Sequence, residues 1–407
     1  MVNISVFFYL VIPFLLSVVS FYMFKRYVNG ATFAQAIGSS VVGFGISAVL
    51  MFGAFYISRG MQTADTEIIN GEVIDKTREH GHYLRPYDCN CRTVTSCSGS
   101  GSSRSCSSRQ VCQTCYEDRY TVTWECIANI GRVTIEHLDT TSRSVYNTPD
   151  PKRYTDIVIG EPFAMENTYT NYIKAVPGSL FRPAQETLKQ QYASQIPAYP
   201  GRVFDFYRIN RTIPVGVNIP NINEWNERIS NALRVLGPKR QANVVVVVTN
   251  IADPNYFYAL QDAWVNGRKN DIVLVIGVPE FPGKPAWVNV MALTQDSIFQ
   301  IRLRDRIMSL DQLTAESVIN NIKEEALASF KRKEMEDFKY LEAEISPPTW
   351  VMVMLTILNI IAYCAFWFYM ITHLSSSTYN RYGVPRYDLN QFKKRVSINN
   401  FNFKHRR

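Results

Sequence analysis

The hydrophobic and polar positions divide the chain into uncharged ends and a mixed, charged middle. Residues 1–24 and 27–58 carry no charged side chain, and a third apolar stretch covers residues 350–371. A helix needs about 20 apolar residues to cross the hydrocarbon core of a bilayer. The pattern therefore predicts three transmembrane helices, two in a hairpin over residues 1–58 and one within residues 346–373.

The charged residues that border these stretches predict an orientation. Lys25 and Arg26 separate the first two stretches, and eight Lys or Arg residues stand against Asp388 alone after Ile345. Basic residues favour the cytoplasmic side of a membrane, so we expect the middle of the chain outside the cytoplasm and residues 374–407 as a basic cytoplasmic tail. Because the net charge of +8 belongs to the ends, we expect the membrane, and no nucleic acid, as its partner.

Runs of β-branched residues organise residues 221–345. Residues 244–248 are all valine and residues 272–276 are all Ile, Val or Leu, which is typical of central strands covered on both faces. A helical segment, residues 256–264, lies between them and predicts a β-α-β unit with a right-handed crossover. Around this unit the pattern predicts a helix from 222 to Leu236, a strand over 286–293, a helix or strand over 298–308, and a long amphipathic helix over 314–345.

Residues 59–165 are predicted to form a small β-rich module. Polar and apolar residues alternate over 120–126 and 132–136, and Asn129-Ile130-Gly131 between them predicts a β-hairpin. Two further strands are predicted, one over 67–74 that is broken by an Asn70-Gly71 turn and one over 153–159.

A connector over residues 166–220 links the two modules. It interleaves aromatic residues with prolines, which leave room for a helix only over residues 183–195. We expect its aromatic side chains to dock it across both modules.

Cysteines concentrate in the β-rich module. Seven of the eight lie within it, at Cys89, Cys91, Cys97, Cys106, Cys112, Cys115 and Cys126. An extracytoplasmic location favours disulfides, which we expect to number three and to leave one thiol over. Two alternatives stay open: a structural zinc site formed by Cys89, Cys91, Cys112 and Cys115, and a redox-active Cys112-x-x-Cys115 pair. The Ser/Gly-rich insert over residues 96–108 is predicted to be a loop.

Three acidic residues follow the predicted strands of the second module. If the strands are parallel neighbours, Asp253, Glu280 and Asp296 converge at one edge of the sheet and bind a divalent cation, Ca²⁺ or Mg²⁺. The alternative places Asp253 at a helix cap, Glu280 in water and Asp296 in a turn. Asp271 precedes its strand and is expected at the opposite edge. The sequence contains no other catalytic motif.

The loop before the second apolar strand, Trp264-x-x-Gly267-Arg268-Lys269-Asn270-Asp271, together with the order of elements over residues 220–335, resembles the TPM domain family. This resemblance implies an α/β/α sandwich outside the cytoplasm, tethered to a membrane. Some members of the family act as phosphatases or bind divalent cations, and others are auxiliary subunits or assembly factors. Here Asn270-Asp271-Ile272 replaces the usual Asp-Asn-Gly, and residues 294–298 replace a glycine-rich stretch, so the resemblance informs the fold more than the reaction.

The Cys-x-Cys and Cys-x-x-Cys-Tyr-Glu segments, followed by the α/β module, are similar to membrane proteins of large tailed bacteriophages. We therefore predict an α+β protein with three transmembrane helices, a cysteine-rich β module and a TPM-like sandwich, in a bacterial inner membrane with its main domain in the periplasm.

The predicted function is binding or scaffolding, with protein partners or with further copies of the chain. A metal-dependent, phosphatase-like hydrolase is one alternative. A holin-like channel is another, because Ser39, Gly43 and Ser47 form a small-residue face on the second helix that either packs within the chain or joins copies.

Overall fold

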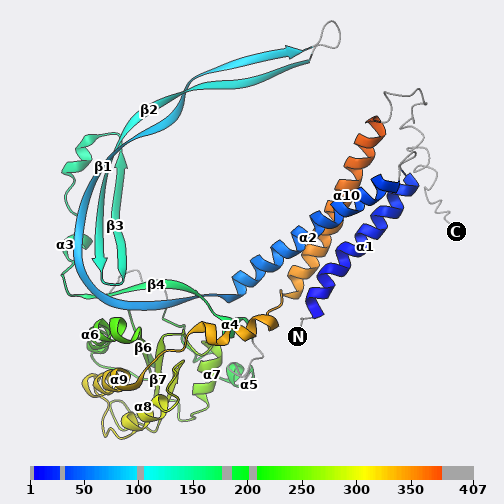
Figure 1. The fold of residues 1–407 in the computed structure, drawn as a ribbon. Coiled ribbons are helices and arrows are strands. Elements are labelled where there is room, and N and C mark those ends of the chain that lie inside the picture. The colour runs from blue at the N-terminus through cyan, green and yellow to red at the C-terminus, as the bar shows by residue number, and fades with distance from the viewer. Residues whose placement is uncertain (1–3, 28–32, 99–104, 177–185, 201–208, 378–407) are drawn as a thin grey trace, which may run out of the picture. The chain divides into compact units, whose positions relative to one another are not determined.

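The computed structural model describes residues 4–27, 33–98, 105–176, 186–200 and 209–377 (Figure 1). The chain divides into two compact units, one of Met1–Thr63 with Tyr340–Arg407 and one of Ala64–Lys339. Most of the predicted cytoplasmic tail, the tip of the serine-rich insert and two parts of the connector lie outside the described residues.

The first unit is helical. It contains α1 (Ile4–Tyr27), α2 (Phe33–Thr63) and α10 (Thr349–Ser377). Among the described residues, two helices are long and apolar enough to cross a membrane, Ala36–Thr63 and Thr349–Phe366, whereas the apolar helix Pro13–Met23 within α1 is shorter. The second and third predicted spans therefore coincide with suitable helices, and the first stays a prediction.

The second unit contains a four-stranded sheet in the order β5-β6-β7-β8. The strands β5 (Thr212–Val215), β6 (Asn243–Thr249) and β7 (Asp271–Gly277) are parallel, and β8 (Trp287–Ala292) is antiparallel to β7. Every residue of β6 and β7 is buried, which confirms the prediction of strands covered on both faces.

Helices cover both faces of this sheet. Because successive side chains of a strand point to opposite faces, alternate valines of β6 enter two separate cores. Val244 and Val246 pack in one core with α6 (Ile222–Arg240), α8 (Phe299–Met308) and α9 (Ala315–Ser329). Val245 and Val247 pack in the other core with α7 (Tyr256–Ala263) and Leu188 of α5 (Glu186–Gln191).

The prediction of one long helix over residues 314–345 is wrong. The helix α9 ends at Ser329, because Phe330 turns to an extended conformation and is buried in the core. The chain then runs beside the end of β8, where Gln295 N–H donates to the Lys331 carbonyl at 2.7 Å and Lys333 N–H donates to the Leu293 carbonyl at 3.0 Å. A separate 3-10 helix, η3 (Met335–Glu344), follows.

In the α/β module, the predicted end at Leu236 of the helix that begins at residue 222 is also wrong. The helix α6 continues through Pro238 to Arg240, since a proline near the end of a helix removes only one backbone hydrogen bond. It ends where Gln241 adopts a left-handed conformation and its N–H donates to the Gly237 carbonyl at 2.7 Å.

The same unit holds an antiparallel sheet in the order β3-β2-β1-β4. Its strands are β1 (Ala64–Ser98), β2 (Ser105–Ala128), β3 (Gly131–Thr140) and β4 (Pro162–Thr170). The predicted hairpin between β2 and β3 is confirmed, with Ala128 opposite Gly131. The strand predicted over residues 153–159 is wrong, because α3 (Lys152–Thr155) occupies its start and buries Tyr154.

The predicted turn at Asn70-Gly71 is wrong as well, because β1 runs through it without interruption. Asn70 is buried and bonds to residues distant in sequence, and its amide donates to the Ala242 carbonyl at 3.1 Å. A Cβ at Gly71 would lie 2.1 Å from Oδ1 of Asn129. These two residues therefore mark a close tertiary approach instead of a reversal of the chain.

Candidate functional site

The β1–β2 ribbon extends beyond the rest of its sheet as a two-stranded arm, which we define as residues 84–98 and 105–118 (Figure 1). Pairing with β3 stops at Tyr120, and pairing with β4 stops at Glu72, so no described strand lies beside the arm. Residues 82–97 are all exposed except Cys89. A two-stranded ribbon without a covering layer is marginally stable in water.

Three cysteine pairs bridge the two strands of the arm, and they supply the stability that it lacks from a core. The pairs are Cys89 with Cys115, Cys91 with Cys112, and Cys97 with Cys106. The expectation of three bridges and one remaining thiol is confirmed in this pairing. The remaining thiol belongs to Cys126, which is buried, and burial raises its pKa to about 11.

The same pairing bears on the two alternatives for the cysteines. The zinc alternative needs Cys89, Cys91, Cys112 and Cys115 as thiolates, but all four are consumed in pairs across the strands. Cys112 and Cys115 bond to different partners, so they do not form the intramotif bridge of a redox Cys-x-x-Cys site. The pairing therefore places six cysteines, all except Cys126 in this segment, as cross-links between the two strands of the arm.

The surface of the arm changes along its length. Its base displays apolar side chains, and Leu84 and Tyr116 are 56% and 64% exposed. Farther out, residues 89–115 contain arginines but no acidic residue and no aromatic residue. The arm thus displays exposed apolar side chains near its base and a positively charged, hydroxyl-rich outer part.

Side-chain contacts at the base of the arm link β1 and β2 to β3. The hydroxyl of Tyr83 donates to Oδ2 of Asp139 at 2.8 Å, and Nε of Arg119 donates to Oδ1 of the same carboxylate at 2.9 Å. The Arg119 and Tyr83 hydrogen bonds lower the pKa of Asp139. Nearby, the ring of His80 stacks on Tyr146 with a centroid distance of 4.6 Å.

A buried polar junction joins the arm-bearing strand β1 to the parallel sheet. Arg211 is 2% exposed, and its guanidinium donates to Asn70 of β1 at 2.7 Å and to Asn243 of β6 at 3.3 Å. Burial lowers the pKa of Arg211 to about 10. Nothing in the sequence pattern identified Arg211, because a single arginine before a short strand carries no periodic signal.

The loop that carries the TPM resemblance contributes to this junction. Asp271 accepts hydrogen bonds from Tyr199 Oη at 2.6 Å, Arg268 N at 2.7 Å and Asn243 Nδ2 at 2.9 Å. Burial raises the pKa of Asp271. Arg268 also pairs with Asp65 of β1. Lys269 N–H donates to Tyr169 Oη of β4 at 3.2 Å, so Arg268 and Lys269 connect this loop to the sheet that contains β1 and β4.

The three acidic residues proposed for a divalent cation do not share an edge of the sheet. Because β8 is antiparallel, it ends at Ala292 opposite Ile272, the start of β7, so Asp296 lies at the edge opposite to Asp253 and Glu280. The proposed convergence depended on three parallel strands and is wrong. Among the described residues no group of three or more His, Cys, Asp or Glu side chains is placed to hold a metal ion.

Asp253 and Asp296 each have partners close by in the chain or on the connector, and Glu280 faces solvent. Asp253 accepts hydrogen bonds from Tyr192 Oη at 2.6 Å and from Asn255 N at 2.9 Å, and the Tyr192 bond lowers its pKa. Glu280 is exposed. Asp296 accepts from Ile298 N at 2.9 Å and pairs with Arg302. As predicted, Asp271 lies at the opposite edge to Asp253.

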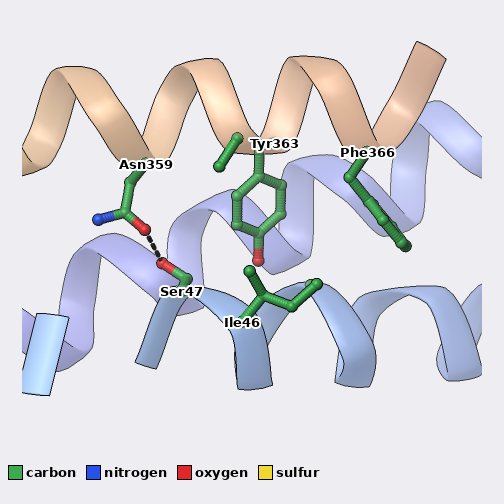
Figure 2. Close-up of a pocket in the computed structure, with 7 residues that line it drawn as sticks. Ile46, Ser47, Asn359, Tyr363 and Phe366 are labelled. Atoms are coloured by element: carbon green, nitrogen blue, oxygen red, sulfur yellow. Dashed lines mark hydrogen bonds between the residues drawn. The ribbon is translucent and has the colours of Figure 1, made fainter. Parts of the chain in front are cut away.

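The helical unit contains a small pocket between α2 and α10 (Figure 2). Ser47 of α2 donates to Oδ1 of Asn359, and the ring of Tyr363 lies against Gly43. The hydroxyl of Tyr363 also lies 2.8 Å from Ser17 Oγ of α1. Two members of the small-residue face are thus occupied by contacts within the chain, and the side chain of Ser39 lies outside the described residues.

Comparisons of the chain with protein-family models, with curated proteins and with solved structures found no match. The chain is a mixed α+β protein with two candidate membrane helices and a β arm whose cysteines pair at disulfide distance, which suits an oxidising, extracytoplasmic compartment.

Proposed function

We propose that this protein is a membrane-anchored scaffold that binds protein partners through the arm outside the cytoplasm. The observation that carries the proposal is a ribbon of two strands, bridged three times by cysteines, in which none of residues 84–97 and 106–118 is buried. Such a segment adds nothing to a core, so its bridges serve to hold a contact surface in one conformation. A surface that is ordered before binding loses less conformational entropy when a partner docks.

The chemistry of the arm supports protein contacts. Tyrosine supplies large contact area with few rotatable bonds, and Tyr83, Tyr87 and Tyr116 are 45%, 46% and 64% exposed near the base of the arm. Aromatic residues of this kind dominate the binding energy of protein interfaces.

The polar junction supports a scaffold role. A buried contact from Asn70 to Arg211 and a partly buried contact from Asp65 to Arg268 bind β1 to the α/β part of the same unit. The strand that carries the arm is therefore fixed to a packed domain, which suits a scaffold.

The proposed function includes a location for the arm. We place the arm in the periplasm of a bacterial inner membrane because its cysteine pairs need an oxidising compartment and its charged flanks favour that orientation. The bacteriophage and TPM resemblances agree with this placement. The hydrolase alternative lacks a supporting observation, since its three acids lie at two edges of the sheet.

Crosslinking followed by affinity purification of the tagged, full-length protein from its native membrane tests the proposal. In the informative variant Asn-Gly replaces residues 84–118, which joins Tyr83 to its partner Arg119 through a two-residue hairpin turn. We expect the captured proteins to be lost with the arm and to be retained in Tyr258→Ala, a change at an exposed residue of α7. Equal capture by both variants would refute a binding arm.

A further inference from the structure

Among the described residues, no strand pairs with the outer edge of β2 along the arm. Residues 105–119 pair with β1 on one side, and β3 occupies the other side only from Tyr120 onward. An open edge presents unpaired N–H and C=O groups, and proteins usually protect such edges with proline, bulges or short strands.

The two edges of the arm differ in this protection. The β1 edge contains Pro86, which lacks an N–H, and a bulge between Cys89 and Arg92, where Asn90 has a φ of 49°. The β2 edge over residues 105–119 has neither a proline nor an extra residue. Only the β2 edge is therefore suited to accept a further strand.

We propose that the β2 edge binds the β2 edge of a second copy of this chain, as an antiparallel pair about a two-fold axis. This proposal rests on the proposed function and names the partner of the arm. For two antiparallel strands the axis must stand perpendicular to the sheet, which keeps corresponding faces of both copies on one side. Since side chains alternate between faces, only residues whose numbers are both odd or both even can then lie opposite each other.

Charge selects one register among those allowed. With Gln113 on the axis, Arg109 lies opposite the partner's Glu117, and Glu117 lies opposite the partner's Arg109, so two opposite-charge pairs form. With Cys112 on the axis, Arg109 would face a cysteine. With Thr114 on the axis, Arg109 would face Arg119, a like charge. The Gln113 register therefore makes the strand complementary to itself.

The same register fits the space that β3 leaves. It pairs residues 108–118 of one copy with residues 118–108 of the other, and β3 begins to occupy the edge at Tyr120. The three cysteine pairs hold the two strands of the arm together before the second copy arrives, so little conformational freedom is lost on pairing.

Charge reversal tests the proposal on the full-length protein in detergent. We expect the wild type to be dimeric. We expect Arg109→Glu alone and Glu117→Arg alone to weaken dimerisation about tenfold or more, because each turns both attractive pairs into like-charge pairs. A mixture of the two variants, carrying different tags, should form a heterodimer, since each glutamate at positions 109 and 117 of one copy then faces an arginine of the other.

The mixture separates a broken interface from a damaged arm, because a misfolded arm would not regain pairing. It also controls for the contacts that Glu117 makes with Arg85 and Arg119 of its own chain, each at 3.8 Å. Arg92→Glu, a matched reversal on β1, should leave the dimer intact. A monomeric wild type, or a mixture that stays monomeric, would overturn the proposal.

A photo-crosslinking residue at position 113 gives an independent readout, because Gln113 lies on the proposed axis. We expect it to link two copies of the chain in the native membrane, and the same residue at position 93 of β1 should not. Links from position 113 only to a different protein would overturn the second copy as partner while leaving a binding arm intact. Loss of all links would count against both.

Discussion

Arg211 donates from Nη2 to Oδ1 of Asn70 over 2.7 Å, and both side chains are buried. The contact joins Arg211, the residue before β5, to the first part of β1, so it connects the parallel sheet to the strand that becomes the arm. A buried guanidinium that loses an acceptor keeps its cost of desolvation, which makes the contact a sensitive point of the fold.

Asn70→Ala should therefore destabilise the protein by about 1–3 kcal/mol, because it leaves the buried Arg211 with one acceptor fewer. Thermal unfolding of the full-length protein in detergent, followed by tryptophan fluorescence, measures the change. Arg228→Met is the matched control, since its ion pair with Glu224 is exposed and such pairs contribute about 0–1 kcal/mol. An equal loss of stability in the two variants would show that the buried contact between Asn70 and Arg211 contributes no more than an exposed ion pair.

The sequence predicted the parts of this fold that have a strong period or composition. The valine run of β6 and its partner β7 were recognised because buried strands are continuously apolar. The cysteine pairs were expected because seven thiols crowd one segment.

Tertiary contacts decided what the sequence did not reveal. Asn70-Gly71 has the composition of a turn. However, the Asn70 side-chain amide donates to the Ala242 carbonyl, and the missing side chain of Gly71 leaves room for Asn129, so the strand continues. The acids Asp253 and Asp296 look alike from sequence, and only the direction of β8 separates them. The direction of a strand depends on its neighbours, and no local pattern encodes it.

Peptide mapping under non-reducing conditions should recover the three bridges. Trypsin cuts after Arg78, Arg92, Arg104, Arg109 and Arg119, which places the six paired cysteines on four peptides. We expect residues 93–104 joined to 105–109, and residues 79–92 joined to 110–119. Cys126 should react with an alkylating reagent only after unfolding, because it is buried and its pKa is raised to about 11.

Reduction before digestion should release all four peptides, which is the control for this experiment. Stoichiometric zinc together with alkylation of Cys89, Cys91, Cys112 and Cys115 in the native protein would contradict the bridges and restore the zinc alternative.

Glu325 should make the protein sensitive to acid. Burial by itself raises the pKa of this carboxyl, but hydrogen bonds from Arg302 and Ser329, with the charges of Arg302 and Arg306, outweigh burial and lower it. A lowered pKa in the folded state means that the stabilisation is present above the ordinary value of 4.5 and is lost as the pH falls through the folded value.

We therefore expect Glu325→Gln to reduce stability at pH 7, by about 1–3 kcal/mol, and this difference to become smaller as the pH falls below 4.5. Melting temperatures between pH 3 and 7 provide the measurement. Glu324→Gln is the control, because the neighbouring Glu324 is exposed and pairs with Arg306 at the surface. A constant difference between wild type and Glu325→Gln across this pH range would contradict the assignment.

Gly43 should be intolerant of a larger side chain. A Cβ at this position would lie 3.1 Å from the Tyr363 ring, and the ring is held by the contact between its hydroxyl and Ser17 Oγ at 2.8 Å. Gly43→Val therefore pushes α2 away from α10, and overpacking of this kind costs about 1–3 kcal/mol. Gly45→Val is a matched control on the same helix, because nothing lies within 4 Å of a Cβ at that position. The fraction of monodisperse protein that remains after heating in detergent should fall for Gly43→Val alone; an equal fall for Gly45→Val would mean that valine disturbs α2 itself and not its packing against Tyr363.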